Sequence, residues 1–96
     1  MGIIWKSILQ HKEDNTCFLC GSTWDLQKHH VWHGTSNRAK AEKDGLYLRL
    51  CSTCHSNLHD KGIKDRYLME VGERAYLSHY NKTIEEFIER YGKNVI

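Results

Sequence analysis

The chain has 96 residues, of which 40% are hydrophobic, so it forms one small domain whose core needs help from a metal ion or disulfides. No apolar run reaches the ~18 residues of a membrane span, and no basic leader with a cleavage site is found. We therefore exclude a membrane protein and expect a cytoplasmic one with reduced cysteines. The net charge is only +2, but residues 28–66 carry eight basic and four acidic side chains, which fits a polyanionic partner.

The first half of the chain predicts one helix and two strands. Residues 2–13 carry apolar side chains at helical spacing, so we expect an N-terminal helix that packs on the core. A turn over residues 15–21 precedes a strand over residues 26–32, and a second strand covers residues 46–50. The polar stretch 34–45 between the strands predicts a loop, with one helical turn after Ser36 as the alternative.

The second half predicts three helices. Residues 51–59 form a turn leading into a helix that ends near Gly62, and a longer helix covers residues 63–80. The expected buried stripe of this longer helix comprises Ile63, Tyr67, Met69 or Val71, and Leu77. Thr83 and Glu86 have the spacing of a capping box at the start of a final helix, and Gly92 ends it. We also expect Trp5, Trp24 and Trp32 in the core.

All four cysteines lie in two C-x-x-C pairs, Cys17 with Cys20 and Cys51 with Cys54. A two-residue gap lets both sulfur atoms of a pair reach one ion, and two pairs complete the tetrahedron that zinc prefers. Such a site is saturated, so it stabilises the fold and performs no chemistry. The alternatives are a redox pair, disulfides, or a site in which His55 replaces one cysteine.

The seven histidines are concentrated beside these pairs. His55 and His59 have the i, i+4 spacing that places two imidazoles on one helix face, close enough to chelate one ion. His29 and His30 point to opposite faces of a strand, which suits one histidine on a metal and one on a nucleophilic water. His11 and His79 lie outside this group. His33 has three open roles: a phosphate contact, a replacement ligand, or a cap of the loop.

The run from Cys17-x-x-Cys20 through His29-His30 to Cys51-x-x-Cys54-His55-x-x-x-His59 resembles the HNH (ββα-metal) endonuclease family in its zinc-stapled form. The paired histidines and the closing H-x-x-x-H are similar to the colicin DNase branch. The stretch His29 to Gly34 with Leu50-Cys51 and Cys54-His55 resembles small phage-encoded HNH proteins. The resemblance covers roughly residues 17–60 of a single domain spanning residues 1–96.

The resemblance implies an α+β fold: a two-stranded hairpin and a helix with a structural four-cysteine zinc site, flanked by an N-terminal helix and two C-terminal helices. It implies that His30 is the general base and that His29, His55 and His59 hold one catalytic divalent ion (Mg²⁺, Mn²⁺, Ni²⁺ or Zn²⁺). Cleavage would leave 5′-phosphate and 3′-hydroxyl ends. The family's middle asparagine is replaced here by the segment Asp44-Gly45-Leu46-Tyr47, with Asn37 or backbone groups near Gly45 as substitutes.

The sequence thus predicts a metal-dependent DNA endonuclease in the cytoplasm of a bacterial or phage-infected cell. Lys28, Arg38 and Lys40 are the candidates for phosphate contacts. The small surface of the chain suggests a homodimer or a helper protein as an additional partner. The alternative is a non-catalytic zinc-binding module that recognises nucleic acid or protein, since degenerate HNH domains bind without cutting.

Overall fold

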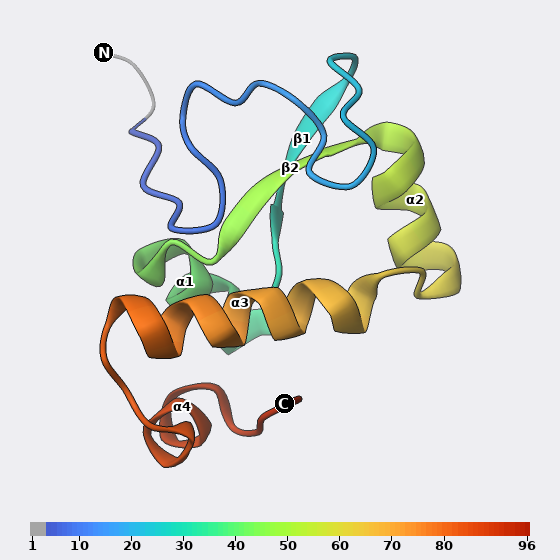
Figure 1. Ribbon diagram of the computed structural model, residues 1–96. Helices are drawn as coiled ribbons and strands as arrows, with labels where there is room; N and C mark the ends of the chain where they lie inside the picture. The colour runs from blue at the N-terminus through green and yellow to red at the C-terminus, as the bar shows by residue number, and fades with distance from the viewer. Residues whose placement is uncertain (1–3) are drawn as a thin grey trace.

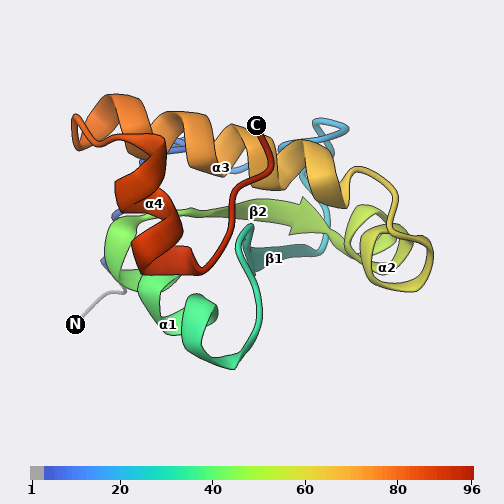
Figure 2. The same cartoon turned by 90° about the horizontal axis from the view of Figure 1, so that it is seen from below.

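A two-stranded hairpin with helices around it forms the fold of the computed structural model, which describes residues 4–96 (Figure 1). The elements are β1 (Leu26–His30), α1 (Thr35–Asp44), β2 (Tyr47–Cys51), α2 (Ser52–Lys61), α3 (Asp65–His79) and α4 (Ile84–Tyr91). Figure 2 shows the hairpin between α3 and α1, with α4 closing one end and α2 at the other. The expected α+β class is therefore confirmed. No helix in this part of the chain is both long and apolar enough to cross a bilayer.

The hairpin is antiparallel and pairs His29 with Leu48 and His30 with Tyr47. Most of β2 is buried, because leucines at alternate positions face the core while the other side of the strand is covered by the N-terminal segment. The fully buried side chains of the core include Leu46, Leu48, Leu50, Leu68, Trp32 and Phe87. The strands lie within one residue of the predicted range at most boundaries, but β1 ends at His30 rather than Trp32.

The expected N-terminal helix is wrong, because residues 4–13 form no helix; residues 2 and 3 lie outside the described part of the chain. The segment instead runs along the outer edge of β2, whose backbone groups would otherwise lack partners. Ser7 donates its hydroxyl to the Tyr47 carbonyl, and the Arg49 amide donates to the Gln10 side chain at 2.8 Å. Covering an exposed sheet edge in this way also blocks pairing with other chains.

Gly45 lets this segment approach the sheet. The Ile8 amide donates to the Gly45 carbonyl at 2.9 Å, and a Cβ at residue 45 would lie 2.5 Å from the Lys6 carbonyl oxygen. The residue also has φ +81°, the left-handed conformation that glycine adopts without steric cost. Any side chain at this position would therefore displace the N-terminal segment.

The loop predicted over residues 34–45 is a ten-residue helix, α1. Its sequence is polar nearly all round, and over residues 36–44 only Ala41 and Asp44 are buried. Contacts with the distant α4 stabilise it: Asp44 accepts two hydrogen bonds from Arg90 and one from the Tyr91 hydroxyl. Helix α1 is thus stabilised by tertiary contacts, which its own hydrophobic pattern does not predict.

The C-terminal helices largely follow the prediction. The capping box is confirmed, since the Glu86 amide donates to Thr83 Oγ1 at 3.2 Å and the Thr83 amide to Glu86 Oε1 at 3.0 Å, and Gly92 ends α4. The expected stripe on α3 is partly wrong, because Ile63 and Tyr67 are exposed. The residues of α3 that are buried are Leu68, Met69, Gly72, Glu73 and Tyr76. The helix begins only at Asp65, after Lys64 in a left-handed conformation, and this start turns Tyr67 outward.

The three tryptophans have different environments. Trp32 is fully buried and Trp5 is half-buried against Tyr47, with ring centroids 4.8 Å apart. Trp24 contradicts the expectation of a core position, because 81% of it is exposed in the turn between Cys20 and β1.

Candidate functional site

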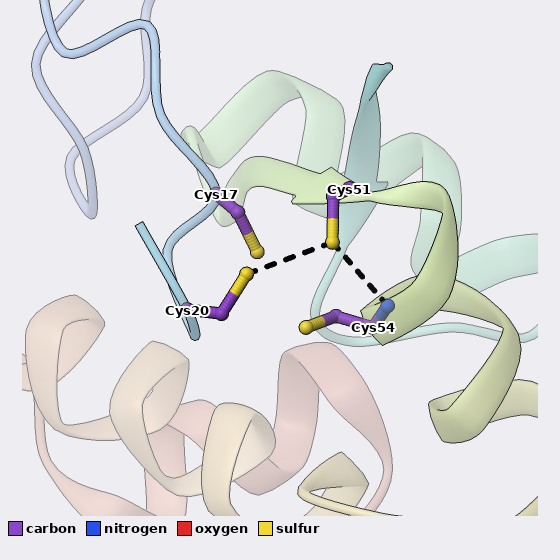
Figure 3. Close-up of side chains that lie close together, drawn as sticks. All are labelled: Cys17, Cys20, Cys51 and Cys54. Carbon is purple, nitrogen blue, oxygen red and sulfur yellow. Dashed lines mark hydrogen bonds between the residues drawn. The ribbon is translucent and has the colours of Figure 1, made fainter. Parts of the chain in front are cut away.

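The four cysteines converge at the junction of β2 and α2 (Figure 3). Cys17 and Cys20 come from the turn before β1, where the Gly21 amide donates to the Cys17 carbonyl at 2.9 Å. Cys51 ends β2 and is the N-cap of α2, so its sulfur accepts a hydrogen bond from the Cys54 amide. All four sulfur atoms lie within 4.8 Å of one another.

The spacing of these sulfur atoms fits a metal ion better than a disulfide. The Cys20 and Cys51 sulfur atoms are 3.7 Å apart, whereas a disulfide bond is about 2.0 Å long. A tetrahedron with metal–sulfur bonds of about 2.3 Å has edges of about 3.8 Å. The cluster could therefore bind a metal ion without rearrangement of the backbone.

The ionisation of the thiols also favours a cation. Burial opposes ionisation of Cys17, but backbone hydrogen bonds from Cys51, Cys20 and Leu19 outweigh it and lower its pKa to about 6. The pKa of Cys54 is raised, by burial and by the neighbouring thiols. Four thiolates cannot share this space without a counter-charge, and a divalent ion would supply it.

A second potential metal-binding group consists of His29, His55 and His59, with their ligand nitrogens within 4.8 Å of one another. His29 comes from β1, while α2 presents the other two on one face. The Nε2 atoms of His55 and His59 are 3.1 Å apart, and an ion with metal–nitrogen bonds of about 2.0 Å would hold them at about 3.3 Å. The three imidazoles thus surround a common point.

The burial and the lowered pKa of the His29 imidazole favour its binding to a metal ion. The residue is 4% exposed, and its Nε2 is buried with no hydrogen-bond partner among the described residues. Burial, followed by the charges of His55 and His59, lowers the pKa of His29 to about 4. The ring is therefore neutral at physiological pH, the form that binds metals. A buried nitrogen without a partner is costly, and a metal ion at this point would remove that cost.

His30, the adjacent residue, lies outside the cluster of three. Its Nε2 is 2.8 Å from Oε1 of Glu42, and its ring lies beside that of Tyr47. The Lys28 ammonium is 2.7 Å from the same carboxylate oxygen, and Lys28 together with His30 lowers the pKa of Glu42. The strand therefore separates the two histidines as its alternation predicts, with His29 toward α2 and His30 toward α1.

The three-histidine group and His30 line one hollow of about 200 Å³. Every lining residue is basic or a histidine: Lys28, His29, His30, His33, Arg38, His55 and His59. A lining of this composition favours anions. A larger, open hollow lies over Trp5 and Arg49, but that guanidinium is already bonded to backbone carbonyls of the N-terminal segment.

The candidate phosphate contacts differ in their surroundings. Arg38 is exposed on α1 and lines the hollow, while Lys28 is paired with Glu42 at its rim. Lys40 lies elsewhere, since it donates to the Arg90 carbonyl at 2.6 Å and ties α1 to α4. Asn37 likewise donates to the Tyr91 carbonyl and does not contact His30. Neither Lys40 nor Asn37 lines the hollow.

Two acidic residues of the site were not anticipated from the sequence. The Glu42 carboxylate is hydrogen-bonded to Nε2 of His30 at 2.8 Å, and the Asp65 carboxylate is hydrogen-bonded to Nε2 of His33 at 3.0 Å. Neither is one of the motif's cysteines or histidines: Glu42 lies in a segment predicted as a loop, and Asp65 lies at the start of α3. Only their charge could have drawn attention to them, because the contacts depend on the tertiary fold. His11 and His79 are exposed and remote from the hollow.

Comparison of the chain with models of known protein families, with curated proteins and with solved structures finds no match.

Proposed function

We propose that the chain is a metal-dependent endonuclease of the HNH (ββα-metal) type that hydrolyses phosphodiester bonds of DNA. The observation that carries the proposal is that His29, His55 and His59 bring ligand nitrogens within 4.8 Å of one another, while the buried Nε2 of His29 has no hydrogen-bond partner among the described residues. Its setting in a hollow lined only by basic residues and histidines adds support, since it matches an anionic substrate. The hairpin and α2 together supply all three ligands.

In this proposal the cysteine cluster holds zinc and is purely structural. Four thiolate ligands fill the tetrahedral coordination of zinc and leave no position for a water or substrate. The three-histidine group has the opposite character, because three nitrogen ligands leave positions open. We assign the catalytic divalent ion to that group alone. When bound, this ion would stabilise negative charge that develops on the phosphate.

His30 is the proposed general base. Glu42 occupies Nε2 of the imidazole, so we assign the hydrogen to that nitrogen and the free lone pair to Nδ1. Nδ1 is then the atom that removes a proton from the attacking water. Glu42 thereby takes the place of the family's middle asparagine as the group that orients the base. Arg38 is the proposed contact to the DNA backbone, and a homodimer or helper protein would extend the small binding surface.

A plasmid-nicking assay tests the proposal. We expect the purified protein to relax supercoiled plasmid with Mg²⁺, Mn²⁺, Ni²⁺ or Zn²⁺, and His30→Ala and His55→Ala to lose this activity. His79→Ala is the matched control, because that histidine is exposed and lies away from the hollow. If none of the four metals supports nicking, the chain is not an endonuclease and the binding-module alternative stands.

A metal count separates the two sites. We expect two ions per chain in the wild-type protein and one in His55→Ala, with the melting temperature of the variant little changed. A chain that binds one ion only, at the cysteines, would contradict the catalytic centre and leave the structural site intact.

A further inference from the structure

His33 forms a second imidazole–carboxylate pair beside the three-histidine cluster. Its Nε2 lies 3.0 and 3.3 Å from the two carboxylate oxygens of Asp65, which sits in the first turn of α3. The two residues are 32 positions apart, and the fold alone brings them together. His33 lines the same hollow as His29, His55 and His59, and its charge acts on His29.

This arrangement repeats that of His30 and Glu42 on a different element. In each pair a carboxylate takes Nε2 of an imidazole that lines the hollow, which leaves Nδ1 as the nitrogen available to a ligand. One pair joins β1 to α1, and the other joins the β1–α1 connection to α3. Hydrolysis by in-line attack requires proton transfer at two places, the attacking water and the leaving oxygen. Two oriented imidazoles in one hollow match that requirement.

We propose that His33 is a second catalytic residue, which protonates the leaving oxygen, with Asp65 as its positioning residue; the inference rests on the proposed endonuclease activity. The water oxygen forms a bond to phosphorus while His30 takes the water proton. The bond between phosphorus and the 3′ oxygen breaks, and its electron pair stays on that oxygen. The oxygen then takes the proton from Nδ1 of protonated His33. Both histidines return to their starting forms by proton exchange with bulk water.

The leaving group offers a direct test. An alkoxide such as the 3′ oxygen of DNA is a poor leaving group without a proton, whereas p-nitrophenolate leaves readily as an anion. We expect His33→Ala to slow plasmid nicking by about 100-fold. Hydrolysis of bis(p-nitrophenyl) phosphate by the same variant should change by less than about threefold. His30→Ala should lose both activities, since both substrates need an activated water.

Asp65→Asn provides a second, milder variant. It keeps the size of the side chain but removes the charge that orients His33, so we expect a loss of about tenfold on plasmid and little on the nitrophenyl ester. His79→Ala is the control for removal of an exposed histidine. Metal content and melting temperature, measured for every variant, should match those of the wild type.

A binding measurement distinguishes proton donation from phosphate contact. In the non-cleaving His30→Ala background, adding His33→Ala should leave the affinity for a labelled DNA duplex within about twofold, as judged by fluorescence anisotropy. A tenfold loss of affinity, or equal losses on the two substrates, would overturn the role of His33 and leave the endonuclease proposal standing. If the wild-type protein cuts neither substrate, the result contradicts both the endonuclease proposal and the role of His33.

Discussion

The Nε2 atom of His30 lies 2.8 Å from Oε1 of Glu42, so the end of β1 is paired with the last turn of α1. Lys28 lies on the other side of this carboxylate and, by its hydrogen bond, is the main cause of the lowered pKa of Glu42. The carboxylate is therefore ionised at neutral pH and accepts a hydrogen bond from the imidazole. The segment predicted as a loop thus provides the partner of the proposed base.

Replacement of Glu42 by glutamine tests this pairing. A neutral amide orients the imidazole less strongly, so we expect Glu42→Gln to lower kcat for DNA cleavage by at least about tenfold, with KM and bound metal unchanged. Glu89→Gln on the exposed face of α4 is the matched control. Unchanged kcat in Glu42→Gln would show that His30 needs no orienting carboxylate.

Loss of His29 should remove the ion proposed at the three-histidine group. Nitrogen ligands favour transition metals over magnesium, so we expect the wild-type protein to bind Ni²⁺ or Zn²⁺ at this centre at least about tenfold more tightly than Mg²⁺. His29→Ala should abolish that binding in a calorimetric titration, and His11→Ala should preserve it. Retention of the ion by His29→Ala would mean that its buried nitrogen is not a ligand.

Loss of one cysteine should affect stability rather than chemistry. Cys20 is exposed and contributes little to core packing, so Cys20→Ser chiefly removes a ligand. We expect the variant to lose the structural ion and several kcal/mol of folding free energy, with a fall in melting temperature of more than about 10 °C. Chelator treatment of the wild-type protein should reproduce this loss. A variant as stable as the wild type would exclude a structural metal at the cysteines.

Glu73 makes the stability of the fold depend on pH. The side chain is buried, and its Oε2 has no hydrogen-bond partner among the described residues. Burial raises the pKa of Glu73 above its ordinary value of 4.5. The stabilisation from the neutral carboxyl is thus complete below the unfolded pKa and is lost as the pH rises through the higher folded pKa.

Replacement of Glu73 by glutamine removes this dependence. We expect the free energy of unfolding of Glu73→Gln, relative to that of the wild type, to increase from pH 4 to pH 7.5 in urea titrations, because only the wild type loses stability as the carboxyl ionises. Glu89→Gln on the exposed face of α4 is the control. A difference that stays constant over this range would show that Glu73 ionises normally in the folded protein.

Local patterns were sufficient to predict the parts of the molecule that depend on spacing. The C-x-x-C pairs, the i, i+4 histidines of α2 and the capping box at Thr83 involve residues close in sequence, so their geometry follows from the local backbone. The hairpin was predictable for the same reason, because its leucines alternate. These features define the cysteine cluster and most of the three-histidine group.

Features that depend on distant contacts were missed. Residues 4–13 have a helical pattern of apolar side chains, but the unpaired edge of β2 binds them as an irregular segment. Helix α1 lacks an apolar stripe and depends on the contact of Asp44 with Arg90, which is 46 residues away. The contact of Glu42 with His30 was not predicted either, because Glu42 lies on this helix. Local propensity is a weak guide wherever the partner of a segment lies elsewhere in the chain.

The position of Cys51 would couple the cysteine cluster to the three-histidine group if both bind ions. This residue closes β2, caps α2 and belongs to the cysteine cluster, and His55 follows Cys54 directly on the same helix. An ion at the cysteines would order the first turn of α2, which carries His55. His55 and His59 would then lose less conformational entropy when they bind a second ion. Loading would be cooperative and reciprocal, because each ion would raise the affinity for the other by the same factor. Removal of one ion would then weaken the binding of the other.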